Sequence, residues 1–191
     1  MYIETDIIFD HLSKVNIGFA SINHDQFKKA AELIWMTSIS NYRNNIYTIG
    51  NGASAAIAQH WACDYTKGCK QGGLRPRVIS LAANIPLMTA ISNDISYEDV
   101  YAFQLEALGQ EDDVLIAISS SGNSPNVVKA LETAKKLKIK TIALTGFSPD
   151  NKCAQLADIS IHVDCDEYEA TEDVHQAIMH MIAKYIRQKN G

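Results

Sequence analysis

The chain reads Val114-Leu115-Ile116-Ala117-Ile118-Ser119-Ser120-Ser121-Gly122-Asn123-Ser124-Pro125 near its middle. Residues 114–118 are apolar without alternation, which is typical of a strand buried on both faces of a parallel sheet. Residues 119–124 are polar and contain one glycine, and Ser124 before Pro125 is a typical start of a helix. A strand that passes through a polar turn into a helix indicates an α/β domain.

Four further apolar runs have the length of strands, and helical patterns lie between them. The predicted strands cover 46–49, 78–81, 114–118, 141–144 and 159–163. The predicted helices between and after them cover 54–66, 85–92, 97–108, 124–137 and 170–188. Two helices with apolar faces, 3–20 and 24–41, precede the first strand. We therefore predict one domain over 1–191, with N-terminal helices in 1–41 and an α/β sandwich with a five-stranded parallel sheet in 42–191.

The composition is that of a folded protein with an acidic balance. Of 191 residues, 47% are hydrophobic and 20% are charged, and 17 basic against 22 acidic side chains give a net charge of −5. This balance argues against a broad basic face for nucleic acid or an anionic membrane. No apolar run approaches the roughly 18 residues of a membrane span, and the acidic stretch from Met1 to Asp6 is unlike a signal peptide. Four cysteines without a C-x-x-C pair, at positions 63, 69, 153 and 165, suit a reducing cytoplasm and argue against disulfides or a cysteine zinc site.

Two polar turns follow predicted strands and could hold a phosphate. In an open parallel sheet the ligand binds outside the carboxyl ends of the strands, where Gly50-Asn51-Gly52-Ala53-Ser54 and the serine turn 119–124 are expected. Helix N-termini bind anions, and serines add neutral donors. The alternative interpretation is structural, with Ser54 and Ser124 acting only as helix caps. Asn93-Asp94 is likewise either a turn or a contact for sugar hydroxyls. Because neither a Gly-Lys-Ser/Thr nor a G-x-G-x-x-G pattern is present, the two turns together favour a single phosphate on a small sugar.

A second group of residues could bind a metal. His60 and Asp64 are four residues apart on one predicted helix, so both point the same way, and Glu172 and His180 lie on the last helix. Imidazole and carboxylate groups are zinc ligands, but the spacing also fits a surface His–Asp pair with unrelated helical histidines. Eight residues of helix rise about 12 Å. One ion therefore reaches both Glu172 and His180 only if the side chains converge or different subunits contribute them.

These motifs resemble the sugar isomerase (SIS) domain family. The resemblance rests on residues 50–60, Ser92-Asn93-Asp94, Ile118–Ser124 and Thr141–Gly146, with Glu172–His175 and His180 beyond them. More narrowly, the chain is similar to the phosphoheptose isomerase branch, whose members convert sedoheptulose 7-phosphate into D-glycero-D-manno-heptose 7-phosphate. The resemblance implies a flavodoxin-like three-layer sandwich, a homotetramer, and a place in heptose biosynthesis for lipopolysaccharide or capsule precursors.

The resemblance also implies roles for individual residues. Contacts with the sugar phosphate fall on Asn51, Gly52, Ala53, Ser54, Asn93, Asp94, Ser119, Ser120, Ser121, Ser124 and Glu172. One zinc ion per subunit would be held by His60, Asp64, Glu172 and His180. Asp64 would be the base and His180 the acid of an isomerisation through an enediol(ate). Asp64 stands where the family has glutamate, Glu172 stands where it has glutamine, and Lys67 is the nearest cation to the position of a family arginine.

A second relative suggests a different function. Residues 50–60, 87–94 and 100–109 also resemble the DnaA-initiator-associating SIS protein, a tetrameric replication regulator without enzymatic activity. That relative lacks acidic and histidine residues at the positions of Asp64 and His180, and this chain has both. The sequence therefore favours a cytoplasmic isomerase over a binding module, with a sugar phosphate as the partner and no direct contact with nucleic acid or membrane.

Overall fold

A five-stranded parallel sheet runs through the middle of the protein, in the order β2-β1-β3-β4-β5. The computed structural model describes residues 4–39, 44–69, 74 and 76–189. The strands are β1 (Asn45–Gly50), β2 (Arg77–Ser80), β3 (Val114–Ser119), β4 (Lys140–Thr145) and β5 (Ile159–His162). This order is that of a flavodoxin-like sheet, in which the chain changes direction between β1 and β3. The predicted fold class and all five predicted strands are confirmed.

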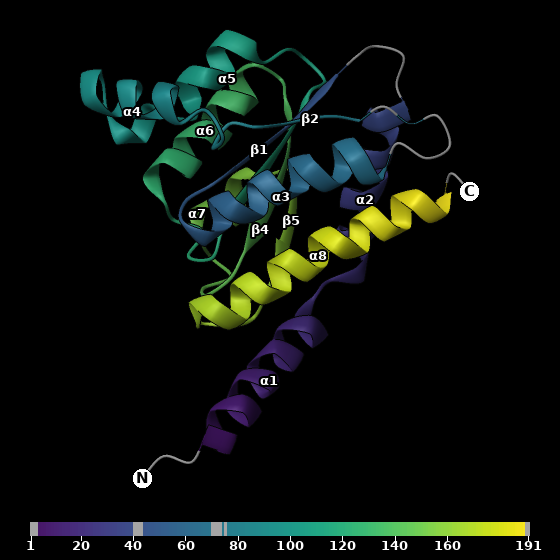
Figure 1. Ribbon diagram of the computed structural model, residues 1–191. Coiled ribbons are helices and arrows are strands. Elements are labelled where there is room, and N and C mark those ends of the chain that lie inside the picture. Colours follow the sequence, from purple (N-terminus) through teal and green to yellow (C-terminus); the bar gives the residue numbers. More distant parts are fainter. Residues whose placement is uncertain (1–3, 40–43, 70–73, 75, 190–191) are drawn as a thin grey trace.

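Helices cover both faces of the sheet (Figure 1). They are α1 (Glu4–Ser21), α2 (His24–Ile39), α3 (Ala53–Gly68), α4 (Ile85–Asp94), α5 (Ala102–Leu108), α6 (Pro125–Lys136), α7 (Lys152–Leu156) and α8 (Tyr168–Lys189). Alternate residues of each strand point to opposite faces of the sheet. Ile116 belongs to the core cluster shared with α2, α3 and α8. Its neighbour Leu115 belongs to the cluster shared with α4 to α7. Among the described helices, none is long and apolar enough to cross a membrane.

The segment between β2 and β3 differs from the prediction. The predicted helix 97–108 is two elements, a short 3₁₀ helix at Tyr97–Asp99 and α5, which begins only at Ala102. Between them the buried Tyr101 donates a hydrogen bond to the Gly50 carbonyl, which ties the segment to the end of β1. Helix α7 was not predicted, because five residues are too few to display a helical period.

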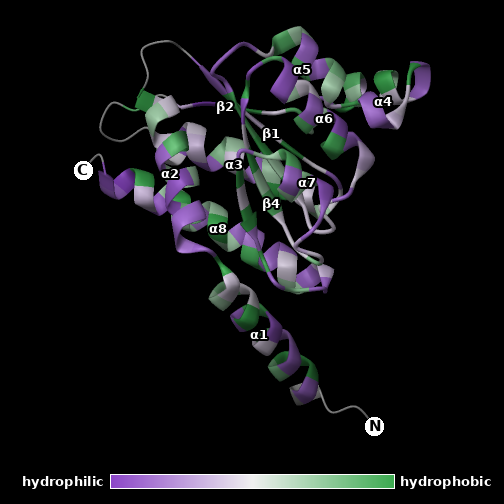
Figure 2. Ribbon diagram, turned by 180° about the vertical axis from the view of Figure 1, so that it is seen from behind, coloured by the Kyte–Doolittle hydropathy of each residue, from purple (hydrophilic) through white to green (hydrophobic). Residues whose placement is uncertain are grey.

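Helix α1 extends away from the sandwich toward the N-terminus (Figure 1). It packs against α8, where His11 Nε2 lies 2.9 Å from the Asp173 carboxylate. Lys14 Nζ lies 3.0 Å from Glu167, the residue before α8. Hydrophobic residues are interspersed along the projecting part (Figure 2). The exposed ones are Ile7, Ile8, Phe9, Leu12 and Ile17. The predicted helix start at residue 3, the helix end at 41 and the boundary after 41 lie outside the described residues.

His175 is fully buried where α8 passes the end of β4. Its Nε2 lies 3.2 Å from the Thr145 carbonyl, to which it donates, and its Nδ1 has no partner among the described residues. Burial lowers the pKa of His175 to about 4, although the hydrogen bond to Thr145 opposes this shift. His162, which lies on the other side of Thr145, lowers the pKa a little further. His175 is therefore neutral in the folded protein.

We expect folding to weaken as the pH falls, because the unfolded chain binds a proton at His175 that the folded chain does not. The pKa of the folded state, about 4, lies below the usual histidine value of 6.5, so this contribution is complete above pH 6.5 and is lost as the pH falls toward 4. The full loss is about 3 kcal/mol. Urea unfolding of the parent and of His175→Gln at pH 7 and pH 5 measures it, with the exposed His24→Gln as control. A His175 ring that titrates near pH 6.5 by NMR would contradict the expectation.

Candidate functional site

A pocket of about 310 Å³ lies at the carboxyl ends of β1 and β3. Its lining comes from the turn after β1, the turn after β3 and the first part of α8. The lining residues are Asn51, Gly52, Ala53, Ser54, Ile118, Ser119, Ser120, Ser121, Ser124, Tyr168 and Glu172. The fold thus brings together the two polar turns that the sequence predicted as a phosphate site, and we call this the serine pocket. Tyr168 was not predicted, since an isolated tyrosine before a helix carries no recognisable signal.

Two helices begin at the serine pocket without a side-chain cap. The N-cap residue of α3 is Gly52, which has no side chain. The N-cap residue of α6 is Ser124, whose hydroxyl makes no capping hydrogen bond. Instead, the Ser124 hydroxyl lies 3.3 Å from the Ser119 hydroxyl, and Ser54 lies within the first turn of α3. The alternative interpretation of Ser54 as a cap is therefore wrong. Ser124 does occupy the N-cap position of α6 before Pro125, as predicted, but its hydroxyl makes no capping hydrogen bond. The start of α3 has no capping side chain, which favours an anion there. The start of α6 adds the positive end of its helix dipole, although Pro125, its first residue, has no N–H group.

The serine turn is supported by residues 151–153, at the start of α7. Gly122 has φ +63°, and a Cβ at this position would lie 2.0 Å from Asn151 Oδ1. The same turn accepts hydrogen bonds from the start of α7, since the N–H of Cys153 donates to the Gly122 carbonyl and that of Lys152 to Asn123 Oδ1. A side chain at position 122 would push this support away, so the serine hydroxyls are held on a rigid turn. The buried Ser120 hydroxyl has no hydrogen-bond partner among the described residues.

The Asn51 side chain joins the two turns. Its amide exchanges hydrogen bonds with the amide of buried Asn126, at 2.8 and 2.9 Å, and its oxygen also accepts from the Tyr97 hydroxyl at 3.0 Å. Asn126 lies in the first turn of α6, so this amide pair fixes the start of α3 relative to the start of α6. Asn51 was predicted to contact the substrate, and the structure adds this bracing role.

A second group of side chains lies further along α3 and α8. His60 Nε2 is 3.3 Å from Asp64 Oδ1, His180 Nε2 is 3.8 Å from Asp64 Oδ2, and the two imidazole rings meet edge to face. One potential ligand atom from each of His60, Asp64 and His180 lies within 4.8 Å of the others. The structure therefore brings together three of the four predicted metal ligands, and the set can hold a divalent ion with a coordination position left open.

Gln176 joins this group, although the sequence did not single it out. Its Nε2 lies 2.8 Å from His60 Nδ1 and 3.3 Å from His180 Nε2. The available signal was its spacing, because residues 172, 176 and 180 repeat every four positions and so lie along one side of α8. The group of His60, Asp64, Gln176 and His180 is called the histidine cluster below.

Three predicted residues lie elsewhere. Glu172 lines the serine pocket and is not part of the histidine cluster, because two turns of α8 separate it from His180. Burial raises the pKa of Glu172, and the nearby carboxylates of Glu169 and Asp173 raise it further. Asn93 and Asp94 are exposed at the end of α4, where the Asn93 amide donates to Asp94 at 2.7 Å. Within one chain neither of them is among the residues that line the serine pocket.

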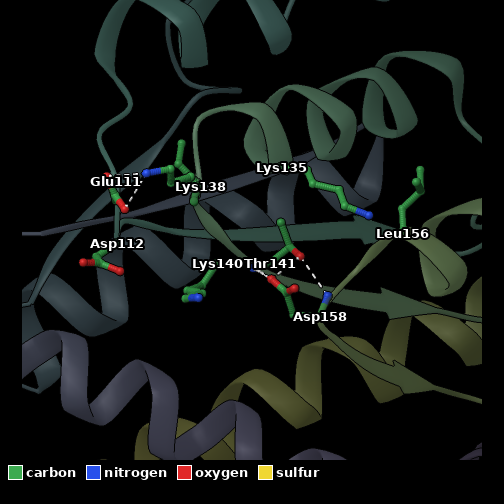
Figure 3. Close-up of a pocket in the computed structure, with 9 residues that line it drawn as sticks. Glu111, Asp112, Lys135, Lys138, Lys140, Thr141, Leu156 and Asp158 are labelled. Carbon is green, nitrogen blue, oxygen red and sulfur yellow. Dashed lines mark hydrogen bonds and ion pairs between the residues drawn. The ribbon is translucent and has the colours of Figure 1, made fainter.

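Another pocket, of about 280 Å³, lies at the opposite edge of the sheet, beside the amino ends of β4 and β5. Figure 3 shows two contacts among its residues, between Glu111 and Lys138 and between Asp158 and Thr141. Lys138 Nζ lies 3.0 Å from the Glu111 carboxylate, and the Asp158 carboxylate accepts hydrogen bonds from the N–H and the hydroxyl of Thr141. These contacts stabilise the starts of β3 and β4. Ligands of open α/β sheets bind at the carboxyl ends of the strands, so we interpret this pocket as structural.

Comparison with known proteins assigns the class. The family model of the SIS domain matches residues 10–146, and the chain belongs to this family. Phosphoheptose isomerase of Helicobacter pylori is 41% identical over 146 residues, which are 76% of each chain. Phosphoheptose isomerase of Aneurinibacillus thermoaerophilus is 36% identical over 188 residues, which cover 96% of this chain and 93% of the relative.

A solved structure agrees with these relatives. Phosphoheptose isomerase GmhA from Neisseria gonorrhoeae superposes with a TM-score of 0.87 at 28% identity, over 97% of this chain and 98% of that one. The predicted resemblance to the phosphoheptose isomerase branch is confirmed. The interpretation as an isomerase, rather than a non-catalytic binding module, is confirmed by the same relatives.

We expect Ser124→Ala to change the free energy of unfolding by less than about 0.5 kcal/mol, because its hydroxyl caps no helix. The matched control is Asn84→Ala at α4, where Asn84 Oδ1 accepts from the Leu87 N–H at 3.2 Å. Loss of that cap should cost about 1 kcal/mol. Urea unfolding of both variants measures the difference, and an equal loss in the two would return Ser124 to a structural role.

Proposed function

We propose that this protein is an aldose–ketose isomerase that converts sedoheptulose 7-phosphate into D-glycero-D-manno-heptose 7-phosphate. The observation that carries the proposal is the pairing of the serine pocket with the histidine cluster along the same two helices. Ser54 and Glu172 lie at the pocket, and His60 and His180 lie further along α3 and α8 respectively. The phosphate would bind in the pocket, and the reacting carbons would reach the cluster.

The spacing of the two groups supports a long substrate. Six residues of helix separate Ser54 from His60 and eight separate Glu172 from His180, which correspond to about 9 and 12 Å. An extended seven-carbon chain, with carbon–carbon bonds of about 1.5 Å, places carbons 1 and 2 at a comparable distance from a phosphate on carbon 7. A pentulose phosphate is two carbons shorter and would reach the cluster less well.

The donors of the serine pocket suit a phosphate monoester. Ser119, Ser120, Ser121 and Ser124 would donate hydroxyl hydrogen bonds, and the turn Asn51–Ser54 would donate backbone N–H groups. Glu172 would oppose the phosphate if it were ionised. Burial and the nearby carboxylates of Glu169 and Asp173 raise its pKa, which makes loss of this charge easier when an anion binds.

The histidine cluster offers the groups that an isomerisation needs. The reaction moves a proton between adjacent carbons and needs a base together with an acid at the carbonyl oxygen. We assign Asp64 as the base and His180 as the acid. Asn93 and Asp94, at the end of α4, do not line the serine pocket of their own chain. We therefore assign them as sugar contacts supplied by another subunit. His60, Asp64 and His180 fit a divalent metal, which we propose to be zinc; when bound, it would supply Lewis-acid polarisation of the sugar oxygens.

We expect Asp64→Ser and His180→Asn each to remove isomerisation while leaving the protein folded, because both residues are partly exposed. The assay follows turnover on a panel of heptulose, hexulose and pentulose phosphates, with the parent protein loaded with zinc and after chelation. The exposed His24→Asn serves as control and should keep full activity. If the zinc-loaded parent turns over none of these sugars, the proposed function is wrong.

Both N-terminal helices were predicted to pack between subunits, but α2 buries Ala30, Ala31 and Ile34 in the core of its own chain. We propose further that the protein is a homotetramer in which α1 packs between subunits. Exposed apolar side chains cover the projecting part of α1, and Phe9 is 72% exposed, an arrangement that favours burial against another chain. Light scattering at micromolar concentration should give four times the chain mass of 21.1 kDa. Phe9→Lys should lower this mass, and the exposed polar control Asn16→Lys should not. A monomeric parent would contradict the proposal.

We also place the protein in the cytoplasm, as a source of precursors for lipopolysaccharide or capsule. The cysteines support this location, since Cys63, Cys69, Cys153 and Cys165 are all free. Free thiols persist in a reducing compartment.

A further inference from the structure

Gln176 touches both histidines of the cluster. It lies one turn before His180 on α8 and faces α3, where its Nε2 is 2.8 Å from His60 Nδ1. The same atom is 3.3 Å from His180 Nε2. An amide nitrogen carries two hydrogens, so this single side chain can donate to both rings.

These contacts determine how the His60 ring is used. If Nδ1 of neutral His60 accepts from Gln176, the ring proton lies on Nε2, which is 3.3 Å from Asp64 Oδ1. Both ring nitrogens then have partners on opposite sides, and rotation of the ring would break two contacts at once. Without Gln176, the ring would lose its polar contact at Nδ1 and would keep the contact with Asp64 and the edge-to-face contact with the His180 ring.

We infer that Gln176 is a positioning residue that holds the His60 ring by Nδ1, so that Nε2 faces Asp64 and His180. The inference deepens the proposed function, on which it rests for its role in the reaction. Histidines that ligate metals donate the other ring N–H to a nearby acceptor, and loss of this partner weakens metal binding by 10- to 100-fold. The Gln176 amide can meet that need as well. If the amide turns over, its Oε1 takes the place of Nε2 and accepts from an Nδ1–H of His60.

The choice of an amide has a specific consequence. A glutamate at position 176 would accept from an Nδ1–H but could not donate to a bare Nδ1, and a leucine of similar size would do neither. Glutamine serves both forms of the ring. The two substitutions therefore separate hydrogen bonding from packing.

The test compares Gln176→Leu and Gln176→Glu with the parent and with Gln188→Leu, which changes an exposed glutamine near the end of the same helix. Nitrogen-15 NMR of the metal-free proteins reports the ring tautomer of His60. Chelator competition reports the zinc dissociation constant. Gln176→Met is a second apolar variant, for use if the leucine variant does not fold.

We expect the parent and Gln188→Leu to show His60 protonated on Nε2, and Gln176→Leu to lose this preference. The zinc dissociation constant should rise about 10- to 100-fold in Gln176→Leu and stay within about threefold of the parent in Gln176→Glu. An unchanged His60 spectrum together with unchanged zinc affinity in the apolar variant overturns the inference. So does an equal loss in Gln188→Leu.

Turnover by the parent separates this inference from the proposed function. A parent that binds zinc but isomerises no sugar phosphate, combined with weakened binding in Gln176→Leu, overturns the function and supports the inference. A parent that isomerises heptulose phosphate, combined with an apolar variant that keeps the tautomer and the zinc affinity, overturns the inference alone. If the parent binds no zinc, the tautomer measurement decides.

Discussion

The packing of α3 against α8 is the contact on which the candidate site depends. Trp61 and Tyr65 are fully buried on the inner side of α3, with their rings stacked at 5.2 Å between centroids. The Tyr65 hydroxyl donates to the Met179 carbonyl of α8 at 3.3 Å. His60 and Asp64 precede these two aromatics by one residue each, so the buried pair determines where the polar pair meets α8. Burial also raises the pKa of Tyr65 well above its usual range, which keeps its hydroxyl a donor.

The other half of the site depends on the reversal of strand order. Because β1 and β3 are neighbours while the chain leaves them in different directions, the starts of α3 and α6 come together over one edge of the sheet. The amide pair of Asn51 and Asn126 holds these starts in place. Tyr97 and Tyr101 add hydrogen bonds from the segment between β2 and β3. The serine turn is thus positioned by neutral hydrogen bonds.

The proposed phosphate site lies in an acidic protein and needs local compensation. The net charge is −5, and among the described lining residues of the serine pocket there is no lysine or arginine. We propose that two helix N-termini and the hydroxyls of the five lining serines supply the positive potential instead. Glu172, the acidic side chain of that lining, is held toward its neutral form by burial and by neighbouring carboxylates. Such a site would select its ligand by shape, because each hydrogen-bond donor must lie opposite an oxygen atom of the ligand.

The sequence by itself determined the α/β class, the five strands and the two polar turns, because apolar runs such as 114–118 and turn residues such as Gly122 express local preferences of the backbone. It also indicated the pairing of His60 with Asp64, since four residues of helix place both on one side. Only the tertiary structure decided that Glu172 belongs to the serine pocket and that Gln176 lies between His60 and His180. These assignments depend on how α8 lies against α3 and the sheet. That arrangement is fixed by contacts between residues more than a hundred positions apart, such as Tyr65 with Met179, which no local pattern encodes.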